Sequence, residues 1–180
     1  MKKVLITLII LLCMLGADAQ NPRIVYSIWK AGAPNFDADD IFTRNAVSAR
    51  WGIKYKNAGG CIISRFRAFN IDIHNAWVYM WIRARYGKDW QERLDKEGDA
   101  EYKTLNMLKD SLEKLDYIQL VKDDLIKNGG ILYSYTRSHQ GSIYYVTVSG
   151  KQHDKFTDFF YFLIDAQKKT ITRTIKSEED

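Results

Sequence analysis

A switch in hydrophobic periodicity at residues 128–130, Asn-Gly-Gly, is the feature that most constrains the fold of this chain. Before it, apolar residues at 99–127 recur every three or four positions, the spacing of an amphipathic helix. After it, the segments ILYSYTR, SIYYVTVS, DFFYFLID and TITRTIK are short, β-branched and aromatic, and turn-forming residues separate them. This order predicts an α+β fold, with N-terminal helices packed on one face of a C-terminal four-stranded antiparallel meander.

The residues before this switch predict two earlier helices and one further strand. Residues 40–51 follow acidic residues that can cap a helix, and residues 70–86 carry a broad apolar face that includes Trp77 and Trp81. We expect this second face to pack against the sheet and to be the most buried helix surface. Between the two helices, residues 53–66 alternate apolar and polar residues and then become apolar, which predicts one further strand.

The first 19 residues have the organisation of a secretory signal peptide. Two lysines precede an apolar run at 4–15, and the small-residue cleavage site at 17–19 lies just before Gln20. The run is too short to span a bilayer, and no later segment approaches the roughly 20 apolar residues that a transmembrane helix needs. We therefore expect a periplasmic or secreted bacterial protein with no transmembrane segment. Residues 20–176 are expected to form a single domain and residues 177–180 a disordered acidic tail.

Removal of a signal peptide would leave Cys61 as the single cysteine of the mature chain, and hence no internal disulfide. It follows two glycines and precedes two isoleucines, a setting typical of a small apolar residue packed in a core strand. As an alternative, Cys61 is a nucleophile with His74 as its base, which would make the protein a cysteine-dependent hydrolase or transferase. A third possibility is an exposed thiol that pairs between chains. We favour packing, because no cysteine-protease signature surrounds Cys61.

The sequence carries no metal or cofactor motif. HExxH, HxH and CxxC are all absent. His139 and His153 fall in turns at opposite ends of one predicted strand, too far apart to share an ion. The formal net charge is +5, with no block of five or more basic residues, so nucleic acid is not an expected partner. We predict no metal, no cofactor and a non-enzymatic function.

The third strand of the predicted meander is apolar on both of its faces. Strict alternation would place Phe160 and Phe162 on one face, and Phe159, Tyr161 and Leu163 on the other. An ordinary solvent-facing surface would alternate with polar residues. Two-sided apolarity therefore indicates either a strand covered on both sides or one face held open for a ligand or partner.

Tyrosines on the neighbouring strands extend this candidate surface. Tyrosine combines a flat apolar ring with a polar tip, a combination common at binding surfaces. The candidate binding residues are Tyr133, Tyr135, Tyr144, Tyr145 and Tyr161. We predict an interaction module that takes a protein or polymer ligand, or a second copy of itself, on an aromatic sheet face. The alternative is that these rings only fill the interfaces between sheet and helices.

Three segments, SARWGIKY, AGGCIIS and RARYGKDW, resemble small exported bacterial domains named after an FEKKY motif. In those domains a helix leads to WGI, then to a strand with a central cysteine, and then to KYGKDW. The resemblance covers roughly residues 38–97. The chain departs from the name-giving motif: it keeps Tyr86 and a basic residue, Arg85, where the family has more of the motif. The resemblance implies export and lends no activity, so no catalytic residue is carried over.

Overall fold

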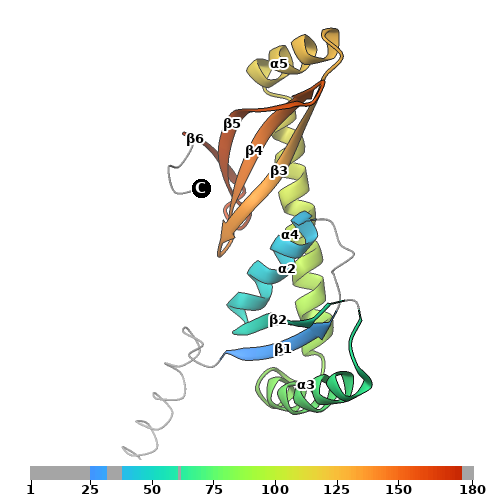
Figure 1. Cartoon of the computed structure of the whole chain (residues 1–180). Coiled ribbons are helices and arrows are strands. Elements are labelled where there is room, and N and C mark those ends of the chain that lie inside the picture. Colours follow the sequence, from blue (N-terminus) through green and yellow to red (C-terminus); the bar gives the residue numbers. More distant parts are fainter. Residues whose placement is uncertain (1–24, 32–37, 61, 176–180) are drawn as a thin grey trace, which may run out of the picture.

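The structure, a computed structural model, describes residues 25–31, 38–60 and 62–175 (Figure 1). Within these ranges the elements are, in order, β1 (Tyr26–Ala31), α2 (Ala38–Arg50), β2 (Ile53–Gly59), α3 (Arg65–Tyr86), α4 (Trp90–Glu113), α5 (Asp116–Lys127), β3 (Ile131–Gln140), β4 (Ile143–Gln152), β5 (Lys155–Asp165) and β6 (Thr170–Thr174). The predicted α+β fold is confirmed. The helical pattern at 99–127 is divided between two helices, because α4 begins earlier than predicted and ends at Glu113.

The four C-terminal strands form one antiparallel sheet in the order β3-β4-β5-β6, which is the predicted meander. Two β-bulges interrupt its register. Arg137 is the extra residue of β3, between the partners of Val146 and Tyr145. Phe159 is the extra residue of β5, between the partners of Ser149 and Val148. A bulge changes the direction in which nearby side chains point, so both positions depart from simple alternation.

Helices α2, α4 and α5 cover one face of this sheet, as predicted (Figure 1). The main core lies between the two layers, and it is apolar because the inward residues of the strands meet one stripe of each helix. Its buried members are Ala46, Leu105, Leu108, Leu112, Ile118, Tyr144, Val146, Val148, Phe162, Ile164 and Ala166.

The N-terminal part forms a second core around a small parallel sheet. β1 and β2 pair with each other and not with the meander, so the strand expected at 53–66 is real but shorter and belongs to a separate sheet. Residues 62–64 lie outside any strand, and Ile62 is 96% exposed. The buried residues of this second core are Ile28, Val47, Ile53, Ile82, Trp90 and Leu94.

Helix α4 joins the two cores. Its 24 residues span about 36 Å, which gives the molecule its elongated shape (Figure 1). Trp90 and Leu94, near its start, belong to the second core, whereas Leu105 and Leu112 belong to the main core. The sheet and α3 therefore lie at opposite ends of the same helix (Figure 1).

Polar residues of α3 fix which of its faces packs against β1. The Asn75 side chain accepts from the backbone N–H of Trp29 at 2.9 Å and donates to the Trp29 carbonyl at 2.8 Å. The His74 ring lies parallel to that of Trp29, and its Nε2 lies 2.8 Å from the carbonyl oxygen of Ser27. These contacts supply hydrogen-bond partners to backbone groups of β1 that would otherwise remain unpaired.

The prediction that Trp77 and Trp81 are buried against the sheet is wrong. Their exposed fractions are 62% and 60%, and α3 buries Ile71 and Ile82 instead. The physical reason is the docking of His74 and Asn75 on β1, which turns the larger apolar face of the helix toward solvent. The start of α3 also differs from the predicted one, because Ser64 caps it and accepts from the backbone N–H of Arg67 at 3.2 Å.

The contact between α5 and the sheet predicts the effect of a substitution at Gly150. A Cβ at this position would lie 2.6 Å from Cδ1 of Leu125 and 2.7 Å from Cε2 of Phe159. Both are packed side chains, so we expect Gly150→Ala to lower the free energy of unfolding by about 1–3 kcal/mol in a guanidinium titration. Gly60→Ala is the control, since an added Cβ there meets no atom within 4 Å. Unchanged stability in Gly150→Ala would show that α5 is not seated on β4.

Candidate functional site

The sheet face opposite the helices carries four of the five predicted tyrosines. The register places Tyr135, Thr147 and Tyr161 in one row across β3, β4 and β5. It places Tyr145 beside Leu163 in the next row. We call this surface the tyrosine face, and its members are Tyr133, Tyr135, Arg137, Tyr145, Asp158 and Tyr161. Each of the four tyrosines is partly exposed, as a binding surface requires.

Tyr144 does not belong to the tyrosine face, which corrects the sequence-based assignment. It points to the helix side, is 0% exposed, and donates a hydrogen bond from its hydroxyl to the Glu101 carboxylate. Burial, together with this hydrogen bond, raises the pKa of the Tyr144 phenol far above its ordinary value. Tyr144 is therefore a structural residue of the main core.

Arg137 lies between two tyrosine rings at the centre of the tyrosine face. Its guanidinium carbon is 5.7 Å from the ring centre of Tyr135 and 5.5 Å from that of Tyr161, within the range of cation–π attraction. Its Nη2 also donates to the Tyr135 hydroxyl at 3.2 Å. Thr147 stands between these two tyrosines in the register, so its small side chain leaves room for the guanidinium above β4.

Asp158 completes the polar centre of the face. Its carboxylate forms an ion pair with Arg137, and it accepts hydrogen bonds from the Ser149 hydroxyl at 2.5 Å and the Tyr161 hydroxyl at 3.4 Å. The side chains of Arg137 and Asp158 remain 22% and 25% exposed. Charged hydrogen-bonding groups that are held in place and still reach solvent can contact a polar ligand.

The hydroxyls of Tyr133 and Tyr161 stay protonated near neutral pH. Burial is the main cause that raises the pKa of the Tyr133 phenol, with further contributions from Tyr135 and Asp158. Burial and the Asp158 charge raise the pKa of the Tyr161 phenol in the same direction. Because the ordinary value already lies near 10, these hydroxyls remain hydrogen-bond donors across the physiological range.

Sequence reasoning found the tyrosines but missed Arg137 and Asp158. Asp158 precedes the β-bulge at Phe159, and strict alternation counted from Phe160 would place it on the helix side. Arg137 is in phase with Tyr133 and Tyr135, so the strand pattern is consistent with its place on this face but does not indicate its contacts. Sequence reasoning also missed an apolar extension of the same face, where Ile131 and Phe156 flank Lys151 in the register and are 60% and 63% exposed. The bulge at Phe159 has the opposite effect, since it moves that ring to the helix side instead of the expected tyrosine side.

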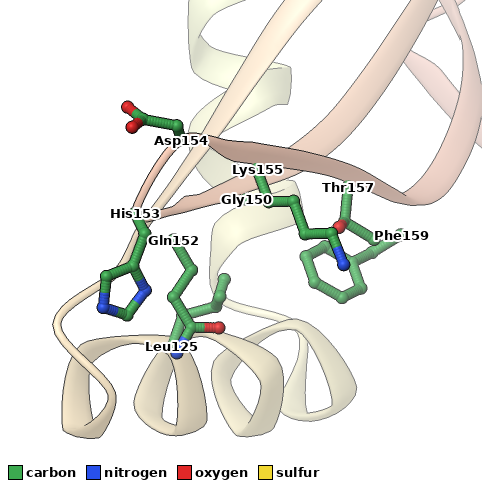
Figure 2. Close-up of a pocket in the computed structure, with 8 residues that line it drawn as sticks. All are labelled: Leu125, Gly150, Gln152, His153, Asp154, Lys155, Thr157 and Phe159. Carbon is green, nitrogen blue, oxygen red and sulfur yellow. The ribbon is translucent and has the colours of Figure 1, made fainter.

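A pocket of about 550 Å³ lies on the helix side, where α5 meets the turn between β4 and β5 (Figure 2). Figure 2 shows Leu125 and Phe159 on its apolar side and Asp154 pointing away from them. Its lining residues are Leu125, Gly150, Gln152, His153, Asp154, Lys155, Thr157 and Phe159. The His153 imidazole and the Lys155 ammonium group provide polar contacts at its rim, and none of its lining residues belongs to the tyrosine face.

The alternative site, Cys61 with His74, receives no support from the part of the chain that the structure describes. Cys61 lies outside the described residues. The His74 ring is stacked on Trp29 with ring centres 3.9 Å apart, and its Nε2 contacts the Ser27 carbonyl. This arrangement gives His74 a structural role in docking α3 on β1, and the catalytic pairing stays a prediction.

Two features are absent from the described residues. These residues contain no group of three or more histidine, cysteine, aspartate or glutamate side chains that could hold a metal ion. Over the same ranges, none of the helices has the length and apolarity needed to cross a bilayer.

Comparisons of the chain with protein-family models, with curated proteins and with solved structures give no match.

Proposed function

We propose that this chain is a non-enzymatic binding module that takes an extended polymer on the tyrosine face. The observation that carries the proposal is the group of partly exposed tyrosines around the Arg137–Asp158 pair. Solvent-facing sheet surfaces normally alternate with polar side chains. A contiguous aromatic surface on the side away from the helices is a feature of interaction sites.

A polysaccharide is the polymer class that best fits this chemistry. The flat rings of Tyr135 and Tyr161 offer apolar surfaces to the C–H faces of sugar rings, and their phenols can hydrogen-bond to hydroxyl groups. Arg137 adds a rigid donor group and Asp158 an acceptor. The face runs across three strands and continues to Phe156, so it suits several units of a chain better than one small molecule.

Export to the periplasm or the cell exterior forms part of the proposal. It rests on the signal-peptide pattern of residues 1–19. In that location the polymers within reach of a bacterial protein include peptidoglycan and polysaccharides from the surroundings. No described arrangement of side chains favours the cysteine-dependent alternative, so a second function is not proposed.

Retention on insoluble polymers tests the proposal. We expect the protein to sediment with at least one of peptidoglycan, chitin and cellulose, and Tyr135→Ser/Tyr161→Ser to remain in the supernatant. Each ring would bury its remaining apolar surface against a sugar, which is worth about 1 kcal/mol at roughly 25 cal/mol per Å², so loss of both should weaken retention clearly. The variant should remain folded by circular dichroism, with a lower melting temperature than the parent, because both tyrosines are only partly exposed and contact the Arg137–Asp158 pair.

The control is Phe66→Ser, which removes an exposed aromatic residue from α3 at the far end of the molecule. It should sediment like the parent. If none of the three polymers retains the parent protein, the polysaccharide class is wrong. If light scattering instead shows a dimer that Tyr135→Ser/Tyr161→Ser dissociates, the face is a self-association surface.

A further inference from the structure

Helix α3 presents a continuous apolar stripe to solvent. The stripe consists of Phe66, Phe69, Ile73, Trp77, Met80 and Trp81, with exposed fractions between 44% and 76%. Their spacing of three or four residues places them on one side of the helix, opposite the side that buries Ile71 and Ile82. Single exposed apolar residues are common, but six in one row along 22 residues mark an interaction surface.

Four exposed arginines border this stripe in a regular arrangement. Arg65 and Arg83 are 18 positions apart, as are Arg67 and Arg85, and that spacing equals about five full helical turns. Each pair therefore shares one angular position. At about 100° per residue, the first pair lies on one side of the stripe and the second pair on the other. Both ends and both sides of the apolar stripe thus carry positive charge.

We propose that this face of α3 docks on a membrane surface that contains anionic lipids. A helix with tryptophan and phenylalanine on one side and arginine along its borders has the pattern of helices that lie in the interfacial plane of a bilayer. The tryptophan rings suit the boundary between acyl chains and headgroups. The arginine stems can cover apolar surface while their guanidinium groups reach the phosphates.

The charge pattern of α3 favours an anionic lipid surface over a second copy of the chain as the partner of this face. Packing two α3 helices together through their stripes brings arginines of one copy near arginines of the other, whether the helices run parallel or antiparallel. Asp72 is the one acidic residue of α3, so little negative charge is present there to offset the repulsion. An anionic lipid surface, by contrast, pairs with all four arginines at once.

The position of α3 allows its apolar stripe and the tyrosine face to bind their partners independently. It lies at the opposite end of α4 from the sheet (Figure 1). A protein held to a membrane through α3 would keep the tyrosine face away from the lipid. The lipid-binding proposal does not depend on the ligand of that face, and its test uses separate variants.

Co-sedimentation with lipid vesicles tests the inference. Every protein compared is the full chain with Leu8→Asp/Leu12→Asp, which removes the lipid affinity of the apolar run at 4–15. We expect this parent to bind phosphatidylcholine vesicles that contain one third phosphatidylglycerol, and to bind more weakly at high salt. Trp77→Ser/Trp81→Ser should lower the partition coefficient at least tenfold, because two large exposed rings no longer enter the interface.

A variant with two arginines neutralised measures the electrostatic contribution to vesicle binding. Arg83→Gln/Arg85→Gln should weaken binding to the anionic vesicles by about 30-fold, and it should have little effect on the weak binding to pure phosphatidylcholine. The matched control is Lys96→Gln/Lys103→Gln, which removes the same charge from exposed positions of α4. A second control, Leu120→Ser, removes an exposed leucine from α5. Both controls should bind like the parent.

Three results would overturn the proposal. The first is a parent that does not bind anionic vesicles even at low salt. The second is tryptophan and arginine variants that bind as well as the parent while circular dichroism shows them folded. The third is a dimer, detected by light scattering without lipid, that Trp77→Ser/Trp81→Ser converts to a monomer. That last result would assign the face to a second copy of the chain.

Discussion

Glu101→Ala is expected to lower the free energy of unfolding by about 3 kcal/mol. The Glu101 carboxylate is only 7% exposed, and it holds Arg50 at the edge of the core and the Tyr144 hydroxyl within it. Its removal leaves a buried hydroxyl and a guanidinium without their common partner. The effect should lie near the lower end for buried ion pairs, since Arg50 remains 29% exposed and can be rehydrated.

Tyr144→Phe is the matched variant for this measurement. It removes one hydroxyl and keeps the Glu101–Arg50 ion pair, so about 1 kcal/mol should be lost. Guanidinium titrations of the two variants give both values. Equal stability of Glu101→Ala and the parent would mean that the carboxylate is hydrated and that α4 does not bring it against β4.

Trp90→Ala is expected to cost about 3–5 kcal/mol, enough to unfold much of the protein if its stability is ordinary. Trp90 is 5% exposed and packs in the second core with Leu94, which makes it a large buried side chain at the start of α4. The loss has two parts, the apolar area returned to water and the cavity that remains. The measurement is the midpoint of thermal or guanidinium unfolding.

Trp81→Ala provides the contrast, because the same side chain is removed from a position that is 60% exposed. We expect a change of no more than about 0.5 kcal/mol, typical of surface substitutions. A large loss of stability in Trp81→Ala and a small one in Trp90→Ala would mean that α3 packs through its tryptophan stripe, as its sequence alone suggested. The pair therefore tests the orientation of the helix directly.

The meander was predictable because each of its strands carries its own signal. Residues 131–174 alternate between β-branched or aromatic segments and short turns, and the asparagine and glycines at 128–130 end the preceding helix. Consecutive pairing of neighbouring strands needs no long-range information. The same pattern predicted that the helices cover one face of the sheet, because an apolar sheet face must be buried against another layer.

The membership of the tyrosine face was predictable in part. Tyr144 and Tyr145 are consecutive, and consecutive residues of a strand point to opposite faces, so they could not both belong to one surface. The Tyr144 hydroxyl can be buried because it donates to Glu101. Glu101 lies on a helix, 43 positions before Tyr144 in the chain. The pattern of a strand does not reveal such a distant partner.

The bulge at Phe159 explains why Asp158, one half of the polar centre of the face, was missed. Alternation assigns each residue of a strand to a face, and one extra residue reverses the assignment beyond it. Phe159 is the extra residue of β5, and it moves Asp158 from the expected helix side to the tyrosine face. The position of this bulge depends on how β5 fits against β4, a property of both strands together.

The orientation of α3 could not be derived from its apolar content. The helix has two apolar sides, and the larger one is exposed. The choice depends on His74 and Asn75, whose hydrogen bonds to β1 form only when that strand is already in place beside β2. Hydrophobic periodicity takes only apolar residues into account, so it cannot predict an orientation that polar contacts determine.

The dissociation constant of Tyr135→Ser/Tyr161→Ser for the polysaccharide that retains the parent protein tests the central claim most directly. Soluble oligosaccharides of that polymer allow the measurement by calorimetry, with Phe66→Ser as the control. Loss of the two partly exposed rings, each contributing about 1 kcal/mol of newly buried apolar surface, predicts affinity at least tenfold weaker. Phe66→Ser should bind like the parent. A double variant that binds within threefold of the parent, while remaining folded, would contradict the assignment of the tyrosine face as the binding site.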